Sequence, residues 1–277
     1  MRLLILDIDG MLGHVLKSYF ESLNYDVATY SPDVDSIYSV EEEIMTFKPD
    51  VVVNCAAVLI KESEEKPRNA ILINSFLPHY LDHLSNKHHF KLIHRSTDCV
   101  FEGKSGDYTE KSVPDATSFY GRTKALGEIN NDHVLTLRVS IIGPNEHPDL
   151  SDDLLSWFSG QNGVVHGYTK VFWTGITTQE FARIIETSIN NNLTGLHNVT
   201  NGQKISKADL LRLFNNHFSH KKEIVDDDSK ISDKSLSRTN TTYDFNIPEY
   251  EVMINEMFDW INDNQETYKS LIERIKQ

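Results

Sequence analysis

The stretch Leu3-Leu-Ile-Leu-Asp-Ile-Asp-Gly-Met-Leu-Gly13 decides the fold, because it joins an apolar run to a turn with two closely spaced glycines. An apolar run of this kind is typical of a strand buried on both faces of a parallel sheet. The residues from Met11 to Leu23 have the spacing of an amphipathic helix. A strand that enters a helix through such a turn is the local structure that binds the phosphates of a dinucleotide.

The two glycines of this turn have different predicted roles. Gly10 lets the backbone approach a pyrophosphate, and Gly13 allows the helix to pack closely against the strand. The spacing fits G-x-x-G-x-x-G only when Asp7 occupies the first glycine place, where a carboxylate would weaken cofactor binding. An ordinary strand-to-helix turn is the alternative, and the turn alone does not decide between the two.

The first half of the chain alternates apolar runs with helical patterns, which is the βαβ rhythm of a parallel sheet covered by helices on both faces. We therefore predict an α/β fold, a doubly wound parallel sheet of the Rossmann type. The predicted strands are Leu3 to Ile8, Asp26 to Tyr30, Val51 to Ala56, Lys91 to His94 and Val134 to Ser140, and the predicted helices are Met11 to Leu23, Arg68 to Leu84 and one that begins near Phe119.

The pattern changes after Gly143-Pro144, and the rest of the chain is predicted to form a smaller, mostly helical C-terminal substrate domain. The predicted boundaries are 1–144 for the dinucleotide-binding domain, with a return near 174–190, and 145–277 for the substrate domain. The polar stretch from Lys221 to Thr242 is predicted to be a solvated loop, with a flap over the substrate as the alternative. Helices are expected at Thr178 to Asn190, Lys207 to Phe218 and Glu251 to Ile275.

Composition excludes several classes of partner. The formal net charge of −14 and the lack of a basic stripe argue against nucleic acid. No apolar stretch reaches the length that crosses a membrane, and Cys55 and Cys99 resemble buried thiols of a reducing compartment, so we expect a cytoplasmic protein without a membrane partner. We predict no metal site, because the spacing of His79 and His83 suggests no third ligand.

A tyrosine and a lysine follow in the segment Tyr120-Gly-Arg-Thr-Lys124. Residues four apart lie on one face of a helix, so both side chains can reach one reacting centre. The ammonium of Lys124 is expected to lower the pKa of the Tyr120 phenol and to contact the cofactor ribose. Thr97 comes after an apolar strand, at the sheet edge where open α/β folds place their chemistry, and is expected to donate to a substrate carbonyl.

With these segments the chain resembles the extended short-chain dehydrogenase/reductases, and among them the dTDP-4-dehydrorhamnose reductase family. The segment Ser96-Thr-Asp-Cys-Val-Phe-Glu-Gly103 is similar to the family's S-T-D-Y-V-F-x-G, and Tyr120-Gly-Arg-Thr-Lys-Ala-Leu-Gly-Glu128 is similar to Y-G-x-[ST]-K-x-x-G-E. The resemblance covers most of the chain and is firmest over residues 1–143.

The resemblance implies three groups of site residues. The catalytic group is Thr97, Tyr120 and Lys124. The cofactor-binding group is Gly10, Met11, Leu12, Gly13, Asn54, Cys55, Ala56, Ala57, Asn74, Tyr120 and Lys124. The substrate-binding group is Thr97, Asp98, Val139, Ser140 and Trp173, with His166 and Trp157 as further pocket candidates, although packing in the core is the commoner role of such aromatic residues.

The resemblance also implies the reaction, in which hydride passes from a nicotinamide to the C4 ketone of a nucleotide-linked 4-keto-6-deoxy sugar while Tyr120 supplies the proton. Tyr30-Ser-Pro32 contains neither the acidic residue typical of NAD sites nor an arginine, and Asp33 or Asp35 beyond the proline is a candidate for the ribose. The resemblance implies NADPH as the preferred cofactor, with NADH as the alternative. The expected partner is a nucleotide-diphosphate sugar, preferably UDP-4-keto-6-deoxy-HexNAc and otherwise dTDP-4-dehydrorhamnose, and the resemblance allows for a homodimer. Coupled epimerisation of the sugar and a non-catalytic regulatory subunit of the same fold stay open as alternatives.

Overall fold

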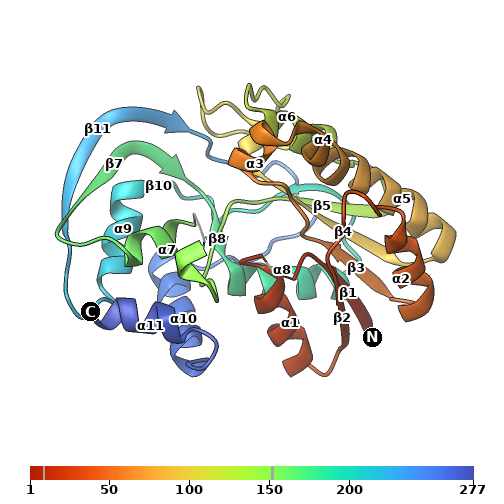
Figure 1. Ribbon diagram of the computed structural model, residues 1–277. Coiled ribbons are helices and arrows are strands. Elements are labelled where there is room, and N and C mark those ends of the chain that lie inside the picture. The colour runs from red at the N-terminus through yellow and green to blue at the C-terminus, as the bar shows by residue number, and fades with distance from the viewer. Residues whose placement is uncertain (9, 151–152) are drawn as a thin grey trace.

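The computed structural model describes residues 1–8, 10–150 and 153–277 and shows a parallel sheet with helices on both faces (Figure 1). The six strands of this sheet lie in the order β2-β1-β3-β4-β5-β9, and every described pair within it is parallel. The predicted α/β class with a doubly wound parallel sheet is confirmed. The strands are β1 (Arg2–Leu6), β2 (Asp26–Tyr30), β3 (Val51–Asn54), β4 (Lys91–Ser96), β5 (Val134–Arg138) and β9 (Gly195–Asn198).

Alternate side chains of β1 enter two different cores. Leu3 and Ile5 pack on the face covered by α1 and α8, and Leu4 and Leu6 pack on the face covered by α2 and α5. Burial on both faces explains why the strand has an unbroken apolar sequence. The helices of the sheet are α1 (Gly13–Ser22), α2 (Ser39–Phe47), α3 (Ile60–Glu65), α4 (Pro67–Ala70), a π-helical turn (Ile71–Phe76), α5 (Leu77–His88), a 3₁₀ turn (Asp98–Val100), α6 (Phe119–Leu126) and α8 (Thr178–Asn190).

A second, three-stranded sheet lies in the C-terminal part, in the order β10-β7-β11. Figure 1 shows this sheet beside α9, with α7, α10 and α11 below it. The remaining elements are β6 (Ile141–Ile142), a 3₁₀ turn (Pro148–Leu150), α7 (Leu154–Ser159), β7 (Val164–Trp173), β8 (Ile176–Thr177), β10 (Ile205–Ser206), α9 (Lys207–Asn215), β11 (Glu223–Asp233), α10 (Tyr250–Asp263) and α11 (Lys269–Lys276).

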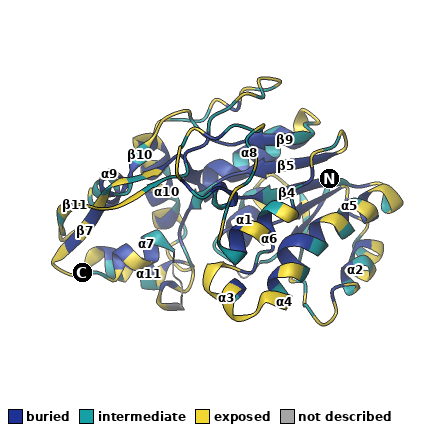
Figure 2. Cartoon of the chain, turned by 90° about the horizontal axis from the view of Figure 1, so that it is seen from above, coloured by how far each residue is buried: buried dark blue, intermediate teal, exposed yellow. Residues whose placement is uncertain are grey.

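Two predictions for the C-terminal part are wrong in detail. Residues 223–233, expected within a solvated loop, form β11, which pairs in parallel with β7. This strand has almost no apolar alternation because most of its residues are exposed, as its colouring in Figure 2 shows. The single terminal helix expected from Glu251 to Ile275 is divided into α10 and α11, since the chain leaves the helical conformation at Asn264. Among the described helices, none is both long and apolar enough to span a membrane.

Candidate active site

The order of the strands reverses between β1 and β3, and the glycine turn lies at this point. Ligands of open α/β sheets bind outside the carboxyl ends of the strands where the order reverses. Asp7 follows β1 with a φ of 75°, a left-handed conformation that suits glycine, and its backbone N–H donates to the Tyr30 carbonyl at 2.9 Å. Asp7 therefore takes the conformation expected at the first glycine place of G-x-x-G-x-x-G.

Gly13 is required by close packing between the turn and α1. A Cβ at this position would lie 2.2 Å from the Asp7 carbonyl oxygen and 2.7 Å from the Ile8 Cα, and both are backbone atoms. A Cβ at Gly10 would meet its nearest atom, Asp7 Oδ2, at 3.1 Å. Met11 is half-buried and Leu12 packs into the core. Close packing therefore requires glycine at position 13, whereas an added Cβ at position 10 would meet only the Asp7 side chain.

A cavity of about 230 Å³ opens where β1, β2 and β3 end. Ala56 and Ala57, two of the residues expected to lie along a cofactor, form part of its wall. Its charged wall residues are all carboxylates, Asp7, Asp33 and Glu62. The cavity lies beside the glycine turn, at the edge of the sheet where open α/β folds bind their ligands.

Asn54, Cys55 and Asn74 hold the segment that follows β3. Asn54 Oδ1 accepts from the Ala56 N–H at 3.2 Å, and burial raises the pKa of the Cys55 thiol to about 12. Asn74 lies in the π-helical turn, fully buried, where its side chain exchanges two 2.9 Å hydrogen bonds with the Val58 backbone and donates to Thr123 Oγ1 at 3.2 Å. The Asn74 side chain therefore makes its hydrogen bonds within the protein. These bonds hold the 55–58 segment in position.

Thr97, Tyr120 and Lys124 are brought together at the end of β4. Ser118 caps α6 by accepting from the Gly121 N–H at 3.2 Å, which fixes the start of the helix that carries the tyrosine and the lysine. The Thr97 side chain makes a hydrogen bond with Tyr120, and Lys124 Nζ donates to the Arg95 carbonyl at 2.8 Å. The one-turn spacing thus places both side chains at the same edge of the sheet.

The direction expected for the pKa of Tyr120 is wrong. Burial raises the pKa of the Tyr120 phenol to about 12, while the nearby Arg95 guanidinium acts in the lowering direction. Burial also lowers the pKa of Lys124 to about 7, and Arg95 adds to this shift. At neutral pH the phenol is therefore protonated, which suits a general acid that delivers a proton to a developing alkoxide.

Arg95 is a site residue that the sequence analysis did not identify. Its guanidinium donates to the Cys55 carbonyl at 3.1 Å and lies within electrostatic range of both Tyr120 and Lys124. Arg95 Nε is buried without a hydrogen-bond partner among the described residues. The sequence does not reveal the role of Arg95, because the groups that it contacts belong to other segments of the chain.

The residues predicted to bind substrate lie along the ends of β4, β5 and β7. The Thr97 hydroxyl donates to Asp98 Oδ1 at 3.1 Å, and Val139 is buried directly after β5. Trp173 Nε1 donates to Ser140 Oγ at 2.8 Å, and the indole is only 3% exposed. Trp173 therefore packs in the core while bordering this edge; by contrast, Trp157 and His166 are exposed.

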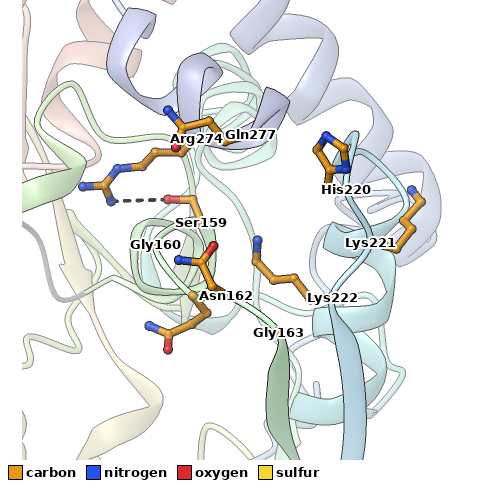
Figure 3. A pocket seen from close by; sticks show the side chains of 10 residues that line it. Ser159, Gly160, Asn162, Gly163, His220, Lys221, Lys222, Arg274 and Gln277 are labelled. Carbon is orange, nitrogen blue, oxygen red and sulfur yellow. Dashed lines mark hydrogen bonds between the residues drawn. The ribbon is translucent and has the colours of Figure 1, made fainter.

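A second cavity, of about 270 Å³, lies between α7 and α11 and contains none of the predicted catalytic residues (Figure 3). Its cations are engaged by the protein itself. Lys221 Nζ donates at 2.7 Å to the carbonyls of Asn215 and Asn216 at the end of α9, and Arg274 forms an ion pair with Asp149. This cavity offers no arrangement for the chemistry described above.

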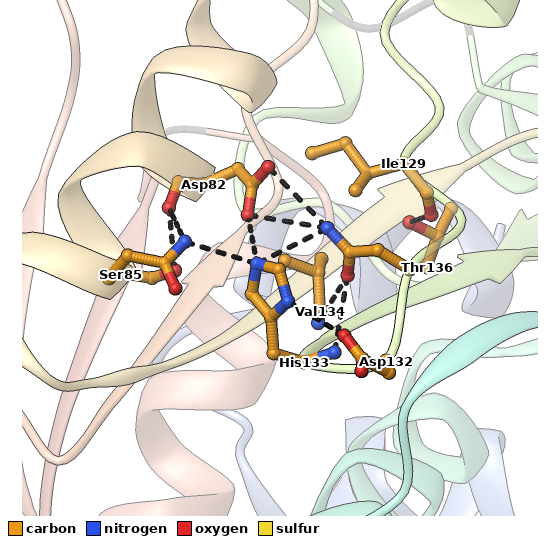
Figure 4. A network of polar contacts seen from close by, with 9 residues as sticks. Asp82, Ser85, Ile129, Asp132, His133, Val134 and Thr136 are labelled. Carbon is orange, nitrogen blue, oxygen red and sulfur yellow. Dashed lines mark hydrogen bonds and ion pairs between the residues drawn. The ribbon is translucent and has the colours of Figure 1, made fainter.

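Three histidines on or near α5 have partners in the protein. His79 Nε2 lies 2.8 Å from the Leu126 carbonyl oxygen, and His88 Nε2 lies 2.8 Å from Glu41 Oε1. Figure 4 shows His133 directed at Asp82, with 2.8 Å between Nε2 and Oδ1, which ties the loop before β5 to α5. Within the described residues, no group of three or more side chains is arranged to hold a metal ion.

The sequence is similar to those of known proteins. The sequence model of the RmlD substrate binding domain family matches residues 1–259. The dTDP-4-keto-6-deoxy-D-glucose reductase of Streptomyces niveus is 33% identical over 132 residues, 46% of this chain and 46% of that protein. The methionine adenosyltransferase 2 subunit beta of Xenopus laevis is 31% identical over 156 residues, 51% of this chain and 47% of that protein. The chain thus spans about half the length of these curated relatives.

Solved structures share the fold of this chain over nearly its whole length. A dTDP-4-dehydrorhamnose reductase from Clostridium acetobutylicum has a TM-score of 0.82 at 21% identity, over 95% of this chain and 100% of that one. The dTDP-4-dehydrorhamnose reductase of Bacillus anthracis in complex with NADP has a TM-score of 0.81 at 19% identity, over 94% and 99% of the two chains. At these identities the likeness concerns the fold.

Proposed function

The chain belongs to the RmlD substrate binding domain family, and we propose that it is a nicotinamide-dependent reductase of the C4 ketone of a nucleotide-linked 4-keto-6-deoxy sugar. The observation that carries this proposal is the convergence of Thr97, Tyr120 and Lys124 at the sheet edge that also holds the glycine turn. The names of the similar reductases support it.

The proposed roles of the residues follow from their places. Bound NADPH would supply hydride to the ketone carbon. Tyr120 is the proton donor, since burial keeps its phenol protonated at neutral pH, and Thr97 is the second donor to the carbonyl oxygen. Gly10 to Gly13 would hold the pyrophosphate through backbone amides, and Lys124 would face the ribose. General-acid catalysis of this type contributes roughly 10²–10⁴ in rate.

For the cofactor we propose NADPH first and NADH second, in agreement with the NADP bound in the Bacillus anthracis structure. We further propose that residues 1–144 with the return at 174–190 bind the dinucleotide and that the remainder of 145–277 binds the sugar nucleotide. The place of β9 beside β5 supports extending this return to residue 198.

For the substrate we propose UDP-4-keto-6-deoxy-HexNAc, with dTDP-4-dehydrorhamnose as the alternative that the names of the relatives support. Coupled epimerisation is tested separately, by turnover in heavy water. Deuterium at a ring carbon next to the ketone would indicate epimerisation, whereas its absence would indicate reduction alone.

The second candidate function is a non-catalytic dinucleotide-binding subunit. It is favoured by the similarity to methionine adenosyltransferase 2 subunit beta and by the carboxylate of Asp7 at the first glycine place. Against it stand Thr97, Tyr120 and Lys124 together, because a binding subunit does not need all three.

The deciding experiment follows NADPH and NADH oxidation at 340 nm with UDP- and dTDP-linked 4-keto-6-deoxy sugars generated in situ. We expect oxidation with the wild type and a loss of roughly 10²-fold or more with Tyr120→Phe, whose dinucleotide affinity is measured alongside. Dinucleotide binding without oxidation of any substrate pair would favour the regulatory subunit.

A further inference from the structure

Lys207 is a cation whose backbone position is fixed at the boundary between the two sheets. It is the first residue of α9 and directly follows β10, which pairs antiparallel with the end of β7 at Phe172 and Trp173. Ser206 caps the helix by accepting from the Asp209 N–H at 3.0 Å. The strand pairing and the cap hold the backbone on both sides of the lysine. The position of the Lys207 Cα is therefore well defined.

The ammonium of Lys207 lies over the indole of Trp173, with 5.2 Å between Nζ and the ring centroid. This indole is held in turn by its bond to Ser140 Oγ, at the end of β5. The lysine is thus part of the wall that faces the catalytic edge. Asp98 and Cys99 both act on Lys207 in the direction that raises its pKa, although burial outweighs them and lowers it to about 8.

In the part of the chain that the structure describes, Lys207 Nζ makes neither a hydrogen bond nor an ion pair. Lys204, three residues earlier, contrasts with it, because its ammonium lies 2.7 Å from Asp107 Oδ2 and 3.0 Å from Asp233 Oδ2. Lys207 is half-buried, and an ammonium that is partly withdrawn from water without an oxygen partner gains when a ligand oxygen binds it. Lys207 is therefore a cation that a ligand can engage at this edge.

Lys234 adds a second ammonium in the neighbourhood of Cys99. It lies within electrostatic range of Cys99 and Glu102, and its stem packs against Gly103, where a Cβ would meet Lys234 Cγ at 2.8 Å. Among the described residues it too has no ion-pair partner. The two lysines come from α9 and from the segment after β11, and both lie near Cys99, two residues after Thr97.

We propose that Lys207, assisted by Lys234, binds the diphosphate of the sugar nucleotide and so holds the sugar against Thr97 and Tyr120. This inference rests on the proposed function and deepens it, since the diphosphate is the anionic group of that substrate class. Two ammonium groups that approach from the C-terminal part would neutralise a diphosphate locally, in a chain whose formal net charge is −14.

The test compares the wild type with Lys207→Met, which keeps the apolar stem, and with Lys207→Arg, which restores the charge. The matched control is Lys230→Met, because Lys230 also lies over an aromatic ring, 5.6 Å from the centroid of Tyr168, but on the exposed strand β11. UDP and dTDP are titrated by calorimetry into each protein saturated with NADP⁺, which keeps the probe out of the dinucleotide site. Circular dichroism checks that each variant is folded.

We expect Lys207→Met to raise the Kd for the diphosphates about tenfold or more, Lys207→Arg to restore most of the affinity and Lys230→Met to leave it unchanged. The Kd for NADP⁺ should stay the same. In turnover, KM for the sugar nucleotide should rise more than kcat falls, because the contact holds substrate and transition state alike.

Wild-type affinity for UDP and dTDP in Lys207→Met would overturn this inference and leave the proposed reductase standing. If the NADP⁺-loaded wild type binds neither diphosphate, then both the inference and the proposed substrate class are overturned.

Discussion

The guanidinium of Arg138 and the carboxylate of Glu128 form a two-pronged ion pair, with 2.6 Å between Nε and Oε1 and 2.7 Å between Nη2 and Oε2. Both side chains are buried, and Ser96 Oγ donates to the same carboxylate at 2.6 Å. Ser96 precedes Thr97, Glu128 follows α6, and Arg138 ends β5. This pair therefore ties together the three elements that carry the catalytic edge.

Replacing Glu128 by Gln should lower the free energy of unfolding by about 3 kcal/mol or more, because the guanidinium of Arg138 is left buried without a counter-charge. Urea unfolding measures the change. The control is Lys170→Met, which breaks an exposed ion pair with Asp228 and should cost less than about 1 kcal/mol. Equal losses in the two variants would show that the Glu128 pair contributes no more than a surface contact.

Gly13→Ala should disrupt the turn, because the added Cβ meets the Asp7 carbonyl oxygen at 2.2 Å and a backbone cannot move aside as a side chain can. We expect a loss of stability of about 2 kcal/mol or more and a fall in NADPH affinity of at least tenfold. Gly10→Ala is the matched variant for stability, since its nearest neighbour is the Asp7 carboxylate, and its loss of stability should be smaller. Calorimetry measures the NADPH affinity and thermal unfolding compares the stabilities, where a larger loss of stability for Gly10→Ala would contradict the packing argument.

The elements that could be predicted from the sequence are those whose residue types or apolar spacing are typical of a strand or a helix. Asp26–Tyr30 and Thr178–Asn190 form a strand and a helix with the predicted bounds, and in α8 the apolar residues recur on one face. The strand Glu223–Asp233 could not be found in this way. Its ladder lies along β7 alone and its side chains are mostly exposed, so that polar residues fill it and the period of two is absent.

The candidate site likewise has features that could be predicted from the sequence and features that could not. Tyr120 and Lys124 could be predicted because their spacing along one helix brings them together whatever the rest of the fold does. The direction of the Tyr120 pKa could not, because it is set by burial and by Arg95 on another element. Lys207 is likewise a single lysine at a helix start, and only the pairing of β10 with β7 brings it to Trp173.

Stability should depend on pH through Lys124, whose pKa burial lowers to about 7 from an unfolded value of ~10.4. Between these values the unfolded chain binds more protons than the folded one, so the stability contribution of this group rises with pH. Below about pH 7 the ammonium is charged in both states and its burial cost is fully present. Lys124→Met should therefore stabilise the dinucleotide-free protein at pH 6 by roughly 1–3 kcal/mol, and the gain should vanish near ~pH 10.

Urea unfolding at pH 6, 8 and 9.5 follows this difference between variant and wild type. Lys17→Met on the exposed side of α1 serves as the control and should change stability by less than about 1 kcal/mol at each pH. If the stability gained by Lys124→Met grows with pH, then folding raises the pKa of Lys124 instead of lowering it.

The carboxylates around the cavity at the ends of β1, β2 and β3 should affect the two dinucleotides unequally. Asp33 and Glu62 are part of its wall, next to the end of the second strand, where the adenosine ribose binds in folds of this type. The 2′-phosphate of NADPH would be repelled by these carboxylates, whereas the 2′-hydroxyl of NADH can donate to one of them. Asp33→Asn should therefore lower the Kd for NADPH several-fold while raising or leaving unchanged that for NADH, and high salt should reduce the gain.

Fluorescence titration of NADPH and NADH at low and high salt measures the effect of Asp33→Asn. Asp35→Asn is the control, because that carboxylate forms an exposed ion pair with Arg68 and is not part of the cavity wall. If Asp33→Asn changes the two Kd values by the same factor, the ribose is not bound at this cavity, since a loss of charge there must act more strongly on the cofactor that carries the additional phosphate. A changed ratio in Asp33→Asn alone would instead place the 2′ position of the ribose beside Asp33 and make this carboxylate the group that limits the affinity for NADPH.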